Sequence, residues 1–253
     1  ELFQPAIALA RDGYVLTERG REFLERAKNR AAHDPEGSAL YFGADGEPVP
    51  AGTLVRNPAL AATLQKIASE GPQAFYSGTF AAGLAEEIAE ATSGAARMTA
   101  SDIAEYEATP RDPVCGTYRA YRICGMGPPS SGATTVFAIL KQLERFDLAS
   151  MGPDSATFWH LFAESQRLAY ADRELYLADA DFVSVPVAGL VEPDYLAERS
   201  ALIAVDARMD SVAPGTPAGA SLALADGAEP AESGTSHFVA VDGAGNAVSY
   251  TST

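Results

Sequence analysis

The residue whose type and setting best suit chemistry is Thr235, in the stretch Gly234-Thr235-Ser236-His237-Phe238. A threonine hydroxyl is a weak nucleophile without a base beside it, and an economical base is the residue's own α-amino group, whose pKa is near neutrality. That amine exists only after the peptide bond between Gly234 and Thr235 is broken. A threonine that simply opens a strand is the commoner meaning of a Gly-Thr pair, so these residues alone leave both interpretations open.

Other catalytic and cofactor patterns are missing from the sequence. It contains no phosphate-binding glycine loop and no Gly-x-Ser-x-Gly elbow. The histidines, His33, His160 and His237, lack metal-ligand spacing, and the two cysteines are too few for a zinc cluster. We therefore expect no metal and no cofactor, neither zinc nor a nucleotide.

Two other polar features of the sequence have structural rather than catalytic interpretations. Ser130-Ser131 follows Pro128-Pro129, and we interpret this loop as a rigid turn into a helix rather than as a nucleophile. His237 lies two residues beyond Thr235 on the same strand face, but the threonine's own amine is a closer base. We expect His237 to be a packed, hydrogen-bonded histidine.

The two cysteines lie in a stretch that alternates like a strand hairpin, from Arg111 to Met126. If the chain turns at Arg119-Ala120, Cys115 and Cys124 face each other, and a disulfide can form in an oxidising compartment. The turn lacks the usual Asn-Gly or Asp-Gly signal. The sequence therefore leaves open whether the two cysteines are bonded.

The first half of the chain predicts helices with clear boundaries. Asn57 can cap a helix that begins at Pro58, and Gly71-Pro72 ends it. A second helix is predicted from about Phe80 to Ala91, and Thr99 to Asp102 has the capping-box pattern ahead of a short third.

The middle of the chain predicts the longest helix. After the loop from Gly127 to Gly132, a helix begins near Ala133, and another runs from about Thr157 to Tyr176 with one apolar face and His160 near its edge. Asp172, Arg173 and Glu174 are expected on a solvated or interface face of this helix.

The last part of the chain changes character. Residues 204–234 are rich in Pro, Gly, Ala and Asp and predict a flexible loop or linker. Ser236–Val241 and Ala247–Thr251 then predict two strands joined by a turn from Asp242 to Asn246. Because strand sequence continues to Thr253, the partners of this ladder are expected elsewhere, and we expect the chain to be a fragment.

Composition excludes several classes of function. There are 34 acidic and 18 basic residues, a net charge of −16, and no compensating basic block, so nucleic acid is not an expected partner. No apolar run approaches the roughly 18 to 20 residues that span a bilayer, so no membrane span is expected.

The residues around Thr235 closely resemble the processing site of the gamma-glutamyltransferase family. The family pattern is a threonine, a small residue, a histidine and an aromatic residue or leucine, leading into a valine-rich strand and an Asp-Gly-Asn turn; here it matches Pro230–Asp242 and Gly245–Ser249. Met126–Gly132 and Tyr170–Arg173, with Asp179–Val183, also resemble the family in the same order. The resemblance extends over nearly the whole chain.

That resemblance implies an α+β fold, the αββα sandwich of N-terminal-nucleophile hydrolases, incomplete in this fragment. It implies self-cleavage between Gly234 and Thr235, with residues 1–234 a helix-rich large-subunit portion that ends in the linker and residues 235–253 the first strands of the small catalytic subunit. Thr235 resembles the nucleophile, and Thr253 resembles the threonine that orients its hydroxyl. The implied substrate is a small gamma-glutamyl compound such as glutathione, with water or an amino acid as acceptor.

The departures from the family pattern limit what this chain does alone. It stops before the asparagine, acidic residue, paired serines and Gly-Gly that the family uses for substrate and oxyanion binding, and it starts after the arginine that holds the substrate carboxylate. We therefore expect it to need the remainder of the small subunit, and to be inactive by itself. A β-lactam acylase acting on cephalosporin or glutaryl compounds and a non-catalytic relative remain alternatives. A periplasmic or extracellular location is expected, because family members commonly carry a leader.

Overall fold

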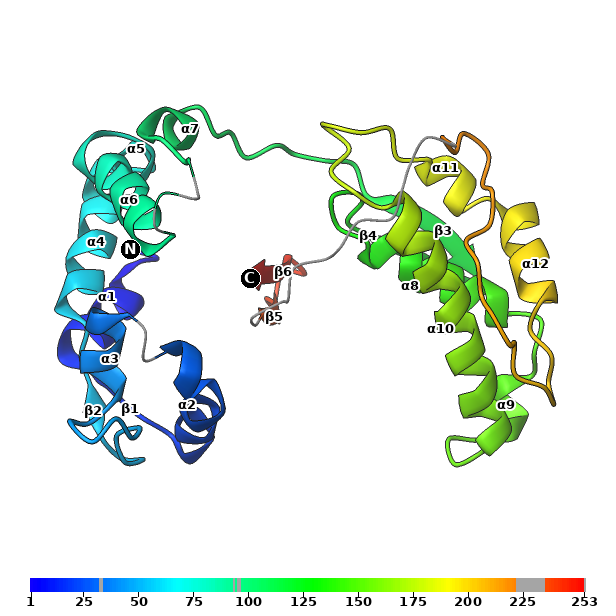
Figure 1. Cartoon of the computed structure of the whole chain (residues 1–253), viewed down its shortest axis with the longest axis horizontal. Helices are drawn as coiled ribbons and strands as arrows, with labels where there is room; N and C mark the ends of the chain where they lie inside the picture. The colour runs from blue at the N-terminus through cyan, green and yellow to red at the C-terminus, as the bar shows by residue number, and fades with distance from the viewer. Residues whose placement is uncertain (32–33, 93, 95–96, 222–234, 253) are drawn as a thin grey trace. The chain divides into compact units, whose positions relative to one another are not determined.

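The computed structural model describes residues 1–31, 34–92, 94, 97–221 and 235–252. Contacts between residues divide the chain into two compact units, Glu1–Thr109 and Pro110–Thr253 (Figure 1). Strands in the described residues form three two-stranded antiparallel sheets, β1-β2, β3-β4 and β5-β6. The chain is thus mixed α+β, and its predicted division at Gly234/Thr235 concerns processing, which these contacts do not test.

The first unit is mostly helical, with one short strand pair. Helix α1 packs against α4, and the buried side chains of Ile7 and Ala61 come from these two helices. The elements of the first unit are α1 (Gln4–Asp12), β1 (Tyr14–Val15), α2 (Glu18–Ala31), α3 (Pro35–Tyr41), β2 (Leu54–Val55), α4 (Pro58–Glu70), α5 (Gln73–Tyr76), α6 (Gly78–Ala91) and α7 (Ala100–Ala104).

The predicted helix boundaries in this unit are confirmed by their capping contacts. The Asn57 side chain accepts a hydrogen bond from the Leu60 N–H at 2.9 Å, and α4 ends at Gly71, whose φ of 82° favours glycine. Thr99 and Asp102 form the predicted capping box at the start of α7. Local sequence therefore sets where these helices begin and end.

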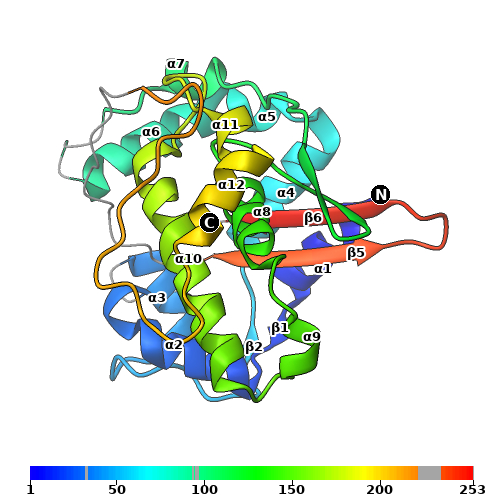
Figure 2. The same cartoon turned by 90° about the vertical axis from the view of Figure 1, so that its right-hand side faces the viewer.

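The second unit is built around the predicted long helix. α8 packs against both α10 and α12 (Figure 2), and Leu161, Leu168 and Leu196 are almost completely buried between them. The elements of the second unit are β3 (Val114–Tyr118), β4 (Tyr121–Gly125), α8 (Gly132–Leu143), α9 (Leu148–Met151), α10 (Ala156–Tyr176), α11 (Val187–Leu190), α12 (Pro193–Ala201), β5 (Ser236–Val241) and β6 (Ala247–Ser252).

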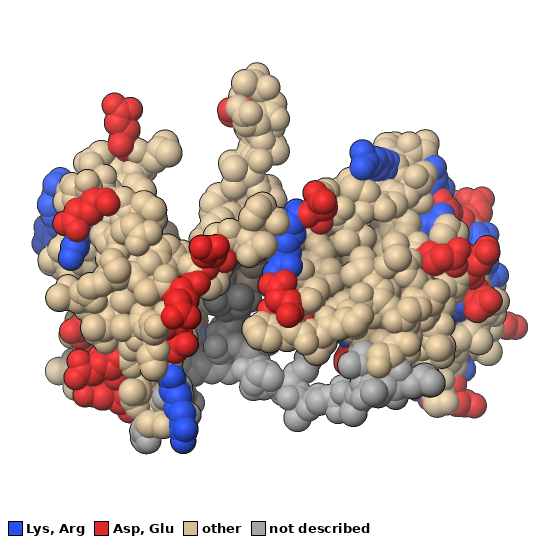
Figure 3. Space-filling view, turned by 90° about the horizontal axis from the view of Figure 1, so that it is seen from above, with Lys and Arg blue, Asp and Glu red and all other residues tan. Residues whose placement is uncertain are grey.

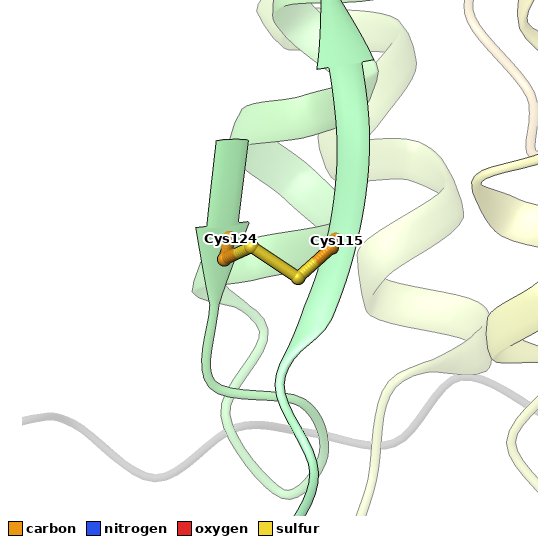
Figure 4. The surroundings of a disulfide bond; sticks show 2 residues. All are labelled: Cys115 and Cys124. Atoms are coloured by element: carbon orange, nitrogen blue, oxygen red, sulfur yellow. A yellow bond between two sulfur atoms is a disulfide. The ribbon is translucent and has the colours of Figure 1, made fainter. Parts of the chain in front are cut away.

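The β3–β4 hairpin settles the question of the two cysteines. It turns at Arg119 and Ala120, with Arg119 at a φ of 53°, so that Cys115 and Cys124 are direct partners across the ladder. Their sulfur atoms are bonded (Figure 4). Gly116 lies against the Phe137 ring of α8, where an added Cβ would approach a ring carbon to 2.1 Å. The absence of a side chain at position 116 therefore allows the hairpin to pack closely on α8.

Residues 204–221 have the irregular backbone that their composition predicts, but they are anchored to α10. The Met209 N–H donates to Glu164 at 2.8 Å, and Arg167 donates to the Met209 carbonyl at 2.8 Å. Further along, the Gly215 N–H donates to Asp172 at 2.7 Å. These contacts hold the first part of the predicted linker in place, while residues 222–234, its remainder, lie outside the described residues.

Asp172 corrects the expectation of a solvated helix face. Its side chain is buried, with 4% of its surface exposed, because it lies four residues after Leu168 on the buried side of α10. It forms an ion pair with Arg199 of α12 at 3.0 Å and accepts a hydrogen bond from the Tyr195 hydroxyl at 2.7 Å. Burial raises the pKa of the Asp172 carboxyl, and the Gly215 N–H and the Arg199 guanidinium oppose that shift.

Removing the Asp172 carboxylate or the Tyr195 hydroxyl should destabilise the second unit. Asp172→Ala leaves the Arg199 guanidinium buried without its counter-ion, which should lower the free energy of unfolding by about 3–5 kcal/mol. Tyr195→Phe removes one hydrogen-bond donor and should cost about 1–2 kcal/mol. Chemical denaturation measures both, with Tyr121→Phe as the control because Tyr121 is 68% exposed. A loss for Asp172→Ala no larger than for the control would contradict the assignment.

The disulfide should stabilise the second unit by closing a short loop. By the chain-entropy account, a bond between residues with a sequence separation of 9 contributes about 2.5 kcal/mol. We expect a reducing agent to lower the denaturation midpoint of the wild type and to leave a Cys115→Ala/Cys124→Ala variant unchanged. Intact mass with and without thiol alkylation provides the direct check, and free thiols in the unreduced protein would refute the bond.

Candidate active site

The hairpin β5–β6 carries Thr235 at its beginning. Both predicted strands are confirmed, and they pair in antiparallel register from Ser236 opposite Ser252 to Val241 opposite Ala247. Thr235 directly precedes β5 and is exposed in the described structure. The candidate nucleophile therefore lies one residue before a regular ladder.

The turn of this hairpin is organised by Asp242. Its carboxylate accepts hydrogen bonds from the Ala244 N–H at 2.9 Å and from the N–H and side-chain amide of Asn246 at 2.8 Å each. Gly245 has a φ of 85°, in the region that favours glycine. These contacts, led by the Asn246 side chain, hold the pKa of the Asp242 carboxyl below its ordinary value.

The two faces of the hairpin differ in chemistry. On one face, Phe238 stacks on Tyr250 of the opposite strand with ring centroids 5.3 Å apart. The other face has valines toward the turn and a polar end around His237. Apolar side chains are exposed on both faces, since Phe238 is 56% and Val239 69% exposed. An isolated two-stranded hairpin is marginally stable in water, so these faces need cover.

His237 lies at the polar end and contacts two hydroxyl groups of β6. Its Nδ1 is 2.7 Å from Oγ1 of Thr251, and its Nε2 is 3.2 Å from Oγ of Ser249. The predicted hydrogen bonding of His237 is confirmed, but the ring is exposed in the described structure rather than packed. Ser249 and Thr251 were not expected from the sequence to contact His237, although the two-residue strand period could have placed both on the His237 face.

The other predicted site residues lie outside the described residues. Gly234, on the far side of the predicted cleavage bond, is one of them, and Thr253, the predicted orienting threonine, is the other. Thr235 is thus the member of the predicted set whose surroundings the structure describes. Its pairing with Thr253 stays a prediction.

The Ser130-Ser131 loop has the architectural role that we expected. The Ser130 hydroxyl accepts a hydrogen bond from the Gly132 N–H at 3.3 Å, at the start of α8. Arg173 of α10 donates to the Ser131 hydroxyl at 3.2 Å. The loop therefore joins α8 to α10.

The described residues can also be compared with what a metal site, a membrane span or a basic binding surface requires. Within the described ranges, no group of three or more His, Cys, Asp or Glu side chains is arranged to hold a metal ion, and no helix is both long and apolar enough to cross a bilayer. The face drawn in Figure 3 has blue Lys and Arg atoms in small groups among red Asp and Glu atoms. That face presents no continuous basic patch.

Comparison with known proteins identifies the family. The family model described as gamma-glutamyltranspeptidase matches residues 1–253. The chain belongs to this family.

Members and relatives of the gamma-glutamyltranspeptidase family with curated names include two different activities. The chain is 36% identical over 256 residues to the glutathione hydrolase proenzyme of Escherichia coli, and 36% identical over 253 residues to the acylase ACY 1 proenzyme of a Pseudomonas species. Both alignments cover 100% of this chain and 42% of the relative. The chain therefore spans less than half the length of these proteins.

Solved structures of the same kind share the fold. The Helicobacter pylori gamma-glutamyltranspeptidase matches with a TM-score of 0.77 and 35% identity, over 85% of this chain and 62% of that one. The cephalosporin acylase of Bacillus halodurans matches with a TM-score of 0.78 and 25% identity, over 97% of this chain and 42% of that one. The mixed α+β arrangement described above is thus common to both kinds of relative.

The stability of the turn around Asp242 should decrease in acid. Because the folded-state pKa of Asp242 is lowered, the turn's stabilisation is present above the unfolded value of about 3.9 and is lost as the pH falls through the folded pKa. The amide NMR signals of Ala244 and Asn246 should therefore stay constant down to about pH 4 and shift together below it. Asp242→Asn should remove this acid transition, and its persistence in that variant would assign it to another group.

Proposed function

We propose that the complete protein is a gamma-glutamyl amide hydrolase or transferase that acts on glutathione-like substrates and is made as a self-cleaving precursor. The observation that carries this proposal is the family match along all of the chain, together with Thr235 at the head of the β5–β6 ladder. The E. coli relative is a glutathione hydrolase, and its name describes a proenzyme. These facts support a precursor that becomes an enzyme when it is cut.

In the proposed chemistry, one oxygen serves two reactions. The Thr235 hydroxyl attacks the Gly234 carbonyl, the peptide bond to the Thr235 nitrogen breaks, and water hydrolyses the resulting ester. The freed α-amine then acts as the base for turnover. The same hydroxyl takes the gamma-glutamyl group from its amide and passes it to water or to an amino acid.

Thr253 has a place in this proposal because of the ladder register. Ser236 is opposite Ser252, so one further pair in the complete protein would set Thr253 across from Thr235. From there, a second hydroxyl can hydrogen-bond the nucleophile and fix its direction of attack. Thr253 lies outside the described residues, so this pairing is part of our proposal for the complete protein.

The exposed faces of the hairpin support the proposed sandwich. A strand pair with apolar side chains on both faces fits the interior of a layered fold, where each face packs against another layer. We propose that the remainder of the small subunit supplies those layers and completes an αββα arrangement. Residues 1–234 would then form the large-subunit portion, and residues 235–253 the first strands of the small subunit.

The disulfide supports a location in an oxidising compartment. Structural disulfides form and persist in the periplasm or outside the cell and are rare in the reducing cytosol. The bond between Cys115 and Cys124 therefore favours a periplasmic or extracellular enzyme.

A β-lactam acylase is the second candidate. It is favoured by the 36% identity to the Pseudomonas acylase proenzyme, which equals the identity to the E. coli hydrolase. The same threonine would act on a different acyl group. Assays of the complete protein with a gamma-glutamyl anilide and with a glutaryl cephalosporin separate the two activities, and inactivity toward both, with no self-cleavage, would favour a non-catalytic relative.

If Thr235 is the nucleophile, its replacement should remove both self-cleavage and turnover. Thr235→Ala should abolish both self-cleavage and turnover, because the attacking oxygen is gone in each. Thr253→Ala should slow both by roughly 10- to 100-fold, since a misplacement of about 1 Å can cost about 100-fold. Gel analysis and N-terminal sequencing of the complete protein measure the cleavage. An uncut wild type, or a Thr235→Ala variant that still yields a subunit starting at residue 235, would refute the assignment.

A further inference from the structure

The uncut chain lacks the base on which the proposed turnover depends. Before cleavage the Thr235 nitrogen is part of a peptide bond, and an amide nitrogen does not accept a proton near neutral pH. The proton of the attacking hydroxyl must therefore go to another group in the first reaction. The inference that follows rests on the proposed self-cleavage and identifies this group.

The described residues of the hairpin offer three side chains that ionise, His237, Asp242 and Tyr250. Asp242 lies in the turn at the far end of the ladder, and Tyr250 is the direct partner of Phe238 on the other face. Thr235 and His237 are two residues apart, and residues with that spacing share a face of a strand. His237 is therefore the base on the nucleophile's face and at its end of the hairpin.

The hydroxyl contacts of His237 extend toward the nucleophile. Thr251 is opposite His237, so it is the diagonal neighbour of position 235 when the register continues by one pair. Diagonal neighbours have Cα atoms about 7–8 Å apart, a separation that one water between two hydroxyl groups can bridge. With such a water, a path would run from the Thr235 hydroxyl through the Thr251 hydroxyl to Nδ1 of the imidazole, and the last step of this path is the contact at 2.7 Å.

The two hydrogen bonds of the ring are compatible with one tautomer that accepts this proton. With Nε2 protonated, the ring donates to the Ser249 oxygen at 3.2 Å and leaves Nδ1 to accept from the Thr251 hydroxyl at 2.7 Å. Ser249 then fixes the tautomer, and Thr251 aligns the ring. Both are positioning residues in this arrangement.

We propose that His237, acting through Thr251, accepts the proton of the Thr235 hydroxyl during self-cleavage of the uncut chain. As the bond forms between the Thr235 oxygen and the Gly234 carbonyl carbon, the Thr235 proton passes to the bridging water, a water proton passes to the Thr251 oxygen, and the Thr251 proton passes to Nδ1. This step produces a tetrahedral intermediate. The imidazolium then returns its proton through the Thr251 hydroxyl and the water to the Thr235 nitrogen, which is an amine in the tetrahedral intermediate, and the carbon–nitrogen bond breaks. Water then hydrolyses the ester, which releases the Gly234 carboxyl and restores the threonine.

This proton path separates the two reactions of the protein. Once the chain is cut, the α-amine lies on the threonine itself and replaces the longer path through His237. Loss of the imidazole should therefore slow self-cleavage much more than turnover. A purely structural histidine would affect both reactions together.

The test follows cleavage of the full-length precursor, made by cell-free translation, for His237→Asn, Thr251→Val and Thr251→Ser. His237→Asn should slow cleavage by roughly 100-fold or more, the scale of one acid–base group. Thr251→Val should slow it as well, whereas Thr251→Ser keeps the hydroxyl and should restore a rate near that of the wild type. His160→Asn is the matched control, because His160 contacts the Ala204 carbonyl from α10 and is not part of the hairpin ladder.

The pH dependence of cleavage gives a readout that a structural role would not move. β6 presents the Ser249 and Thr251 hydroxyls to the ring, and its ionisable side chain, Tyr250, belongs to the other face. Cleavage of the wild type should slow as acid protonates the imidazole, and His237→Asn should lose this acid limb. The cleaved form of His237→Asn, isolated after long incubation, should turn over within about threefold of the wild type, because its base is the α-amine.

The outcomes distinguish this inference from the function on which it rests. A wild type that stays uncut refutes the proposed self-cleavage itself. A wild type that is cut, with His237→Asn cut at the same rate or with the same acid limb, refutes only the role of His237. Equal losses of cleavage and turnover in His237→Asn, or a failure of Thr251→Ser to restore what Thr251→Val removes, would also overturn the proposal.

Discussion

The second unit depends on one buried carboxylate. Asp172 on α10 forms an ion pair with Arg199 of α12 and accepts hydrogen bonds from the Tyr195 hydroxyl of α12 and from the backbone N–H of Gly215. Three segments that are distant in sequence therefore meet at a single side chain. A buried charge is stable only when it is paired and fully hydrogen-bonded, so each segment must adopt its place for the others to be satisfied. Glu164, two turns earlier on α10, repeats the arrangement with Arg167 and Met209.

These anchors have a consequence for the segment that leads to the candidate cleavage bond. Composition alone marks residues 204–234 as a uniform linker, yet Met209, Ala213 and Gly215 in its first part are held on α10 and α12 by polar contacts. The predicted linker is therefore not uniform, because its first part is fixed by these contacts.

The β5–β6 hairpin combines two constraints. Its ladder register determines which side chains share a face with Thr235, and this places the His237 imidazole beside the Thr251 and Ser249 hydroxyls. Its exposed apolar residues, such as Phe238 and Val239, require cover from further layers. The chain spans 42% of the length of its E. coli relative, and the layers that we propose for the complete protein would supply this cover. The same strands thus bear the residues of the proposed chemistry and the exposed apolar side chains that other layers would have to cover.

Sequence alone determined the features whose causes are local. The cap at Asn57, the capping box of Thr99 and Asp102, the long helix and the two terminal strands all follow from spacing and backbone preference within a few residues. The family and the candidate nucleophile Thr235 also follow from sequence, because a processing motif is a contiguous pattern. Whether Thr253 joins that site lies beyond the described residues.

Only the tertiary structure decided the contacts between distant segments. It showed that Asp172 is buried rather than solvated, that residues 204–221 are anchored, and that Cys115 and Cys124 are bonded. It also placed Ser249 and Thr251 against His237 across the ladder. Each of these depends on which residues meet after folding, and a carboxylate or hydroxyl on a helix or strand looks the same in sequence whether it faces water or a partner.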